Sequence, residues 1–163
     1  MLTVNTIDLW NTAGGRSHRA IPFALPAILL ASTLTACQSS PPIQLVYPDG
    51  PQRYDDWTEA QRRQDIAVRT LSHSEAVSTH LIRLKGREFP HYHDRHDLSV
   101  TVLAGTAVIH FKEHGMRLGP GDAVFIPRGN YHWAENTGPE ASIVHAVFSP
   151  GFDGKDRRRA DAE

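Results

Sequence analysis

Two histidine-bearing segments constrain the fold of this chain more than any other feature of its sequence. The first places His91 and His93 two residues apart. Side chains two residues apart on a β-strand leave the same face, so both imidazoles can contact one ion. The second segment, residues 121–136, carries His132 and reads GDAVFIPRGNYHWAEN. We therefore predict that folding brings the three imidazoles together around a buried divalent metal.

The remaining pattern favours β-structure. Short segments rich in β-branched residues alternate with turn formers, which is typical of an antiparallel barrel or sandwich. The expected strands cover residues 66–71, 76–84, 98–104, 106–111, 116–118, 123–126, 132–135 and 142–148. The chain has 163 residues, 40% hydrophobic and 21% charged, which suits one core rather than two domains. Its formal net charge of -1 gives no indication of a nucleic-acid partner.

The residues around the histidines resemble the two motifs of the cupin superfamily. The second motif is complete, with Gly121, Pro127, Gly129, His132 and Asn136. The first motif lacks its Glu, whose position falls on Leu98 next to Asp97, and is otherwise represented by Gly86, His91, His93 and Gly105. This resemblance covers roughly residues 66–148. It implies an all-β, single-domain cupin, a small antiparallel β-barrel or jelly roll, over residues 57–152. Cupins often pair, so a homodimer is the assembly it implies.

The ligand set indicates the kind of metal. Imidazole nitrogens favour Fe, Zn, Ni or Cu over Ca or Mg, which prefer oxygen. Mn is less favoured, although cupins with a Glu ligand accept it. A shifted Asp97 is the candidate fourth ligand and leaves one or two coordination positions open for water or substrate. The alternatives are a barrel mouth without an ion, and a chelate in which His96 joins His93 on a helical turn. His96 can also act next to the ligands, where a neighbouring carboxylate orients an imidazole.

The parity of one expected strand depends on that fourth ligand. If Leu98 takes the family's Glu position, then Leu98, Val100 and Val102 face the cavity. If Asp97 is a ligand instead, the inward set is reversed. Arg128 and Tyr131 border the site and are the candidate substrate-binding residues, suited to a carboxylate or a ring.

Two classes of function agree with these features. The first is a metal enzyme of the dioxygenase, isomerase or decarboxylase type. The second is a module that binds or senses a small molecule without turnover. Both use the same cavity and the same ion.

The N-terminal segment has the order of an export signal. Two arginines precede an apolar run, residues 20–36, which ends directly before Cys37. The sequence Leu-Thr-Ala-Cys that ends at Cys37 resembles the bacterial lipobox. This resemblance implies that residues 1–36 are a lipoprotein signal peptide and that Cys37 carries the lipid, such as palmitate. Because Gln38 follows, it also implies a place in the cell envelope at the outer membrane. A buried cysteine and a lasting transmembrane segment are the alternatives.

The flanks of the domain are expected to be simple. Residues 37–56 begin with several Ser and Pro residues and are predicted to form an extended tether. Thr58 and Gln61 match a capping box, which predicts a short helix from about residue 59 to 65, with a polar loop as the alternative. Residues 153–163 form a charge run and are predicted to be a disordered tail.

Overall fold

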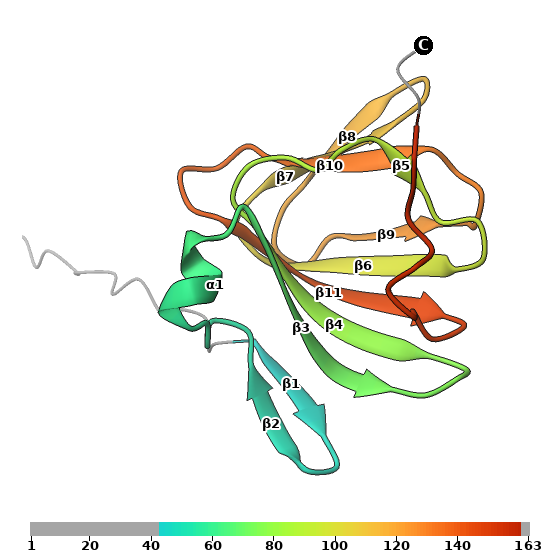
Figure 1. Cartoon of the computed structure of the whole chain (residues 1–163). Coiled ribbons are helices and arrows are strands. Elements are labelled where there is room, and N and C mark those ends of the chain that lie inside the picture. Colours follow the sequence, from blue (N-terminus) through green and yellow to red (C-terminus); the bar gives the residue numbers. More distant parts are fainter. Residues whose placement is uncertain (1–42, 161–163) are drawn as a thin grey trace, which may run out of the picture. The chain divides into compact units, whose positions relative to one another are not determined.

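Two five-stranded antiparallel sheets form the domain in the computed structural model, which describes residues 43–160 (Figure 1). The first sheet has, in spatial order, β12 (Arg158–Arg159), β5 (His91–Tyr92), β10 (His132–Asn136), β7 (Ala107–Phe111) and β8 (Gly115–Leu118). The second has β3 (Ile66–His73), β4 (Ser78–Leu84), β11 (Ser142–Ser149), β6 (Asp97–Ala104) and β9 (Ala123–Ile126). The chain passes repeatedly from one sheet to the other, as in a jelly roll. The all-β fold predicted from the sequence is confirmed.

Alternation along the strands divides the apolar residues between two clusters. Side chains from both sheets meet in the interior cluster, whose buried members are Leu98, Ile109, Ile126, Ala146 and Phe148. The other cluster lies on the opposite face of the second sheet and comprises Trp57, Ala67, Leu81, Leu103 and Ile143. The interior cluster borders a cavity, so the core itself positions the candidate site.

The strand β6 follows one of the two parities considered above. Leu98, Val100 and Val102 line the cavity, whereas Leu103 packs in the cluster on the outer face. Gly105 ends this strand with a φ of 75°, a conformation that favours glycine. A Cβ at this position would lie 2.8 Å from the Cα of Ser142, so the turn also requires the absence of a side chain.

The residues before the barrel are more ordered than expected. Instead of an extended tether, the strands β1 (Gln44–Tyr47) and β2 (Gly50–Arg53) form a hairpin. Leu45 packs against the outer-face cluster, and the Tyr47 hydroxyl donates to Thr79 Oγ1 at 2.7 Å. Pro51 is accommodated because this ladder has only two strands. The Ser and Pro residues predicted a tether, but the contacts of Leu45 and Tyr47 with the barrel hold the hairpin in place.

The short helix forms where the capping box predicts it. Helix α1 (Glu59–Arg63) begins after Thr58, whose side chain accepts from the Gln61 backbone N–H, and the Gln61 side chain accepts from the Thr58 N–H. It ends two residues earlier than expected. Within residues 43–160, no helix is long and apolar enough to cross a membrane.

The C-terminal segment also differs from the expected disordered tail. Residues 151–160 lead from the end of β11 to the edge of the first sheet, where β12 pairs with β5, and Asp156 is buried (Figure 1). Charge runs are usually solvated, but this one contacts the loop after β5. Asp156 accepts from the backbone N–H groups of Asp94 and Arg95, and Arg158 pairs with the Asp94 carboxylate. The predicted signal peptide, residues 1–36, and Cys37 lie outside the described residues.

Candidate metal centre

Three buried histidines converge at one end of the interior space. His91 in β5 pairs directly with His132 in β10, and His93 follows β5 by one residue. Each side chain retains 5% or less of its exposure, and one nitrogen from each ring lies within 4.8 Å of the others. The closest ring centroids, those of His91 and His132, are 4.4 Å apart. The predicted convergence of these three side chains is confirmed.

Backbone carbonyls fix the tautomer of all three rings. The Nδ1–H groups of His91 and His132 donate to the carbonyl oxygens of Phe89 and Asn130, at 2.8 and 2.9 Å. The Nδ1–H of His93 donates to the backbone carbonyl of Asp156. A carbonyl can only accept, so Nδ1 carries the proton and Nε2 keeps its lone pair for a ligand bond.

The rings are also held neutral. Burial is the main reason why the pKa of His91 falls to about 3 and that of His132 to about 4. Burial lowers the pKa of His93 as well, although the hydrogen bond to the Asp156 carbonyl partly opposes it. Metals bind the neutral imidazole. The three side chains therefore suit a divalent transition metal in their charge, tautomer and spacing.

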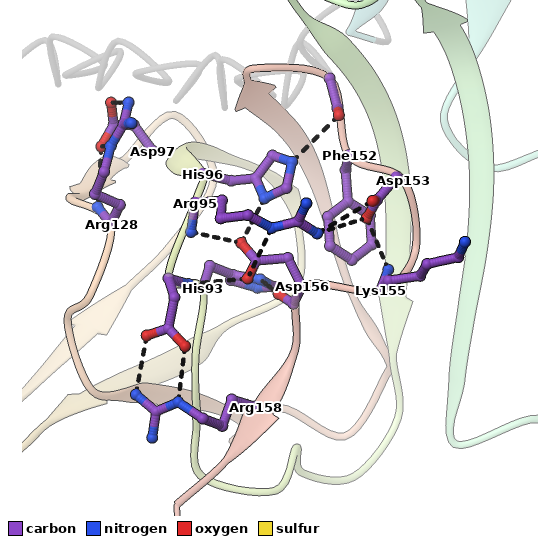
Figure 2. Close-up of polar contacts among 12 residues, drawn as sticks. His93, Arg95, His96, Asp97, Arg128, Phe152, Asp153, Lys155, Asp156 and Arg158 are labelled. Carbon is purple, nitrogen blue, oxygen red and sulfur yellow. Dashed lines mark hydrogen bonds and ion pairs between the residues drawn. The ribbon is translucent and has the colours of Figure 1, made fainter.

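A buried carboxylate braces the loop that carries His93 (Figure 2). Asp156 accepts from the backbone N–H groups of Asp94 and Arg95, at 3.1 and 2.8 Å, and from His96 Nδ1 at 2.5 Å. These hydrogen bonds outweigh the effect of burial and lower the pKa of Asp156 to about 2. The same residue thus anchors the loop with its side chain and orients His93 with its carbonyl oxygen.

His96 does not join His93 in a chelate. Both of its ring nitrogens are engaged, with the Asp156 carboxylate and with the Gly151 carbonyl oxygen at 3.2 Å. The predicted position beside the ligands is therefore the one observed. The carboxylate it contacts is Asp156, which comes from the C-terminal segment rather than from the His96 loop.

Asp97 is not brought to the histidines, which corrects its assignment as the fourth ligand. Both of its oxygens face Arg128, with Nε–Oδ1 and Nη2–Oδ2 distances of 3.1 and 2.6 Å (Figure 2). The physical reason is parity, because Leu98 takes the inward position and its neighbour must point outward. Among residues 43–160, the cluster that could hold a metal consequently consists of three histidines and includes no carboxylate.

The two candidate substrate-binding residues lie outside the cavity wall. Arg128 is engaged by Asp97 at the surface, and the Tyr131 ring packs edge-on against Tyr92 with centroids 5.7 Å apart. Neither side chain is among the residues that line the cavity.

Next to the three histidines, a cavity of about 490 Å³ extends between the sheets. This volume is in the range of small-molecule sites. Its wall is mostly aliphatic, but it includes the ion pair between Glu88 and Arg157, whose Oε1–Nη2 distance is 3.1 Å. Burial raises the pKa of Glu88, despite Arg157 and the backbone N–H of Ala134. Sequence reasoning missed this pair, since Arg157 sits in an arginine run and the segment of Glu88 gave no clear parity.

Comparisons with known proteins agree with the fold. The Cupin_2 model of the cupin domain matches residues 81–148. An uncharacterized protein of Aquifex aeolicus (strain VF5) is 40% identical over 98 residues, which span 60% of this chain and 80% of that protein. The structure of KdgF from Halomonas sp. is similar at 29% identity and a TM-score of 0.53, covering 60% of this chain and 90% of that one.

A second solved structure shares the fold at lower identity. It is an uncharacterized conserved protein with a double-stranded β-helix domain from Klebsiella pneumoniae subsp. pneumoniae MGH 78578. The identity is 23% and the TM-score 0.54, with 61% of this chain and 88% of that chain covered. This chain belongs to the cupin family.

Proposed function

We propose that the protein binds a divalent transition metal through the Nε2 atoms of His91, His93 and His132, together with a small molecule in the adjacent cavity. The observation that carries this proposal is the set of three Nδ1 hydrogen bonds to backbone carbonyls. They leave the Nε2 lone pair of each neutral ring available for the same ion. Nitrogen donors favour Fe, Zn, Ni or Cu, and Mn is less favoured without a carboxylate.

A three-histidine site leaves coordination positions open. When bound by these histidines, such an ion would supply Lewis acidity or redox chemistry beside the cavity. Glu88 adds a carboxyl group to the same cavity, and burial raises the pKa of this carboxyl, which favours a role in proton transfer. These features favour a metal enzyme of the dioxygenase or isomerase type.

A non-catalytic binding or sensing protein is the second candidate. It is favoured by the wall of the cavity, which is predominantly aliphatic and offers few polar groups for chemistry. Discovery of a ligand that survives purification unchanged, identified by mass spectrometry of the denatured protein, would favour this alternative over turnover.

Elemental analysis of the purified chain tests metal binding. The wild-type protein is expected to retain close to one equivalent of transition metal, and the double variant His91→Ala, His93→Ala almost none. His114→Ala is the matched control, because His114 is an exposed turn residue away from the cluster. Equal metal contents in the wild type and the double variant, at equal folded content by circular dichroism, would rule out the site.

We propose in addition that the protein is a lipoprotein of the cell envelope, anchored at the outer membrane through Cys37. The support is the order of the N-terminal sequence, two arginines, an apolar run and Leu-Thr-Ala-Cys. A fatty-acid probe should label the wild type and not Cys37→Ser, and fractionation should place the label in the outer membrane. Labelling that persists in Cys37→Ser would contradict the anchor.

A further inference from the structure

Arg157 is the only Lys or Arg side chain that lines the cavity formed by the described residues. It belongs to the C-terminal segment, directly after the buried Asp156, and its side chain is 38% exposed. The bracing of Asp156 therefore fixes the point at which Arg157 enters the wall. Its two neighbours lie elsewhere: Arg158 pairs with Asp94 and Arg159 covers the Phe89 ring at 4.2 Å.

Most of the hydrogen-bonding capacity of Arg157 is unused within residues 43–160. Its side-chain partner is Glu88, whose Oε1 accepts a single hydrogen bond from Arg157 Nη2. The other oxygen of Glu88 accepts from the Ala134 backbone N–H at 3.1 Å. Guanidinium groups bind carboxylates with two parallel hydrogen bonds, so Arg157 retains donors for a second acceptor.

The charges around the site favour the binding of an anionic group. Arg157 lines the same cavity as His91, His93 and His132. The three imidazoles are neutral, and Leu98 stands where the family resemblance places a carboxylate. A dication there would share the cavity with the Arg157 guanidinium, and Glu88 is the one acidic side chain among the described residues that line it. An anionic group between the ion and Arg157 would relieve this repulsion.

The rest of the wall indicates what carries the anionic group. Its aliphatic side chains include Val100, Val102, Ile109, Leu118, Ile126 and Val144. They suit an apolar body rather than a sugar, which needs many hydrogen-bond partners. One guanidinium beside a glutamate also suits a single negative charge better than a phosphate dianion.

We propose that Arg157 binds the carboxylate of a small monocarboxylic acid, whose apolar body occupies the cavity between the sheets. This inference rests on the proposed function, because it uses the same cavity and places the carboxylate beside the metal site. Arg157 is then the residue that selects acids over neutral molecules of the same shape.

Equilibrium dialysis of the full chain in detergent tests the proposal. The probes are the straight-chain acids from butanoate to octanoate, each compared with the alcohol of equal length. The metal-loaded wild type should prefer at least one acid over its alcohol by about tenfold or more. Arg157→Gln should weaken binding of that acid by about 10-fold to 100-fold and leave the alcohol unchanged. Arg159→Gln, two residues further along the same segment but outside the cavity, should bind both probes as the wild type does.

Glu88→Gln separates recognition from a structural role. Removing this negative charge should leave acid binding unchanged or tighten it, because it competes with the ligand for Arg157. If the pair merely holds the wall together, Glu88→Gln and Arg157→Gln will weaken binding of both probes alike, which overturns the proposal. Melting curves of the two variants establish that both remain folded, and Arg157→Lys, which keeps the charge, should lose less affinity than Arg157→Gln.

Two outcomes distinguish this inference from the proposed function. A wild-type chain that retains metal but prefers no acid over its alcohol refutes the role of Arg157 and leaves the metal site intact. A chain that retains no metal but prefers acids in an Arg157-dependent way refutes the metal site and supports the role of Arg157.

Discussion

The contact that most directly couples stability to the metal site is the Asp156 carboxylate, and we expect Asp156→Asn to disrupt both. The carboxylate accepts from two backbone N–H groups and from His96. An asparagine has the same shape but only one acceptor oxygen. At least one of the three donors is then left buried without a partner, or faces an amide N–H.

The magnitude follows from burial and charge. Asp156 is 7% exposed, and breaking a buried charged contact costs about 3–5 kcal/mol. Proton linkage gives a lower bound, because a pKa lowered from 3.8 to about 2 corresponds to about 2 kcal/mol. This contribution is present above about pH 4 and is lost as the pH falls toward 2. Substitution should cost more than protonation, since it also strands donors. For a domain of this size the midpoint of thermal unfolding should fall by roughly 10–20 °C.

Thermal and urea unfolding of the metal-free protein near neutral pH measure this loss. The control is Asp153→Asn in the same segment, whose side chain is 43% exposed and pairs with Arg95 at the surface. It should cost less than about 1 kcal/mol. The metal affinity of Asp156→Asn should also fall about 10-fold, because the segment that orients His93 is loosened. Equal unfolding free energies for the two variants would refute the bracing role.

Three further predictions concern the site and the fold. The pKa values of about 3 for His91 and about 4 for His132 lie below 6.5, so the unfolded chain binds protons more readily than the folded one. The metal-free protein should therefore lose stability as the pH falls from about 7 to 5, by up to about 1.4 kcal/mol per pH unit for each group, and a flat urea-unfolding profile would contradict this. Leu98→Glu should destabilise the metal-free protein by burying a charge, yet slow metal loss to a chelator; unchanged metal retention would mean that position 98 does not reach the ion. Gly105→Ala should cost at least about 2 kcal/mol more than Gly129→Ala in urea unfolding, because only the former meets backbone within 4 Å while both have a φ near 75°.

Much of the fold could be predicted because it follows from patterns of neighbouring residues in the sequence. The alternation of β6 placed Leu98, Val100 and Val102 on one face, and the structure has them facing the cavity. Thr58 and Gln61 predicted the start of α1 from their own side chains. The strands β1 and β12 were missed for the opposite reason: their pairing depends on anchors such as Leu45 and Asp156, whose partners are distant in sequence.

The candidate site divides in the same way. The histidines were predictable because spacing on a strand fixes which face two of them share, and the register of β10 brings the third. The fourth ligand was not predictable, since a shift of one residue exchanges Asp97 for Leu98 at the inward position. Glu88 and Arg157 meet only after the C-terminal segment has reached the edge of the first sheet, so no local pattern joins them.

The dependence of His93 on Asp156 has a consequence for how the protein is made and handled. Synthesis proceeds from the N-terminus, so a nascent chain displays every imidazole of the cluster before the brace for one of them exists. Chains clipped by a protease ahead of Asp156 would keep all three rings but hold metal loosely and release it to competing chelators. Fusion partners or affinity tags attached shortly after residue 160 would disturb the contacts of Asp156 with the His93 loop. Metal measurements are therefore best made with the tag elsewhere.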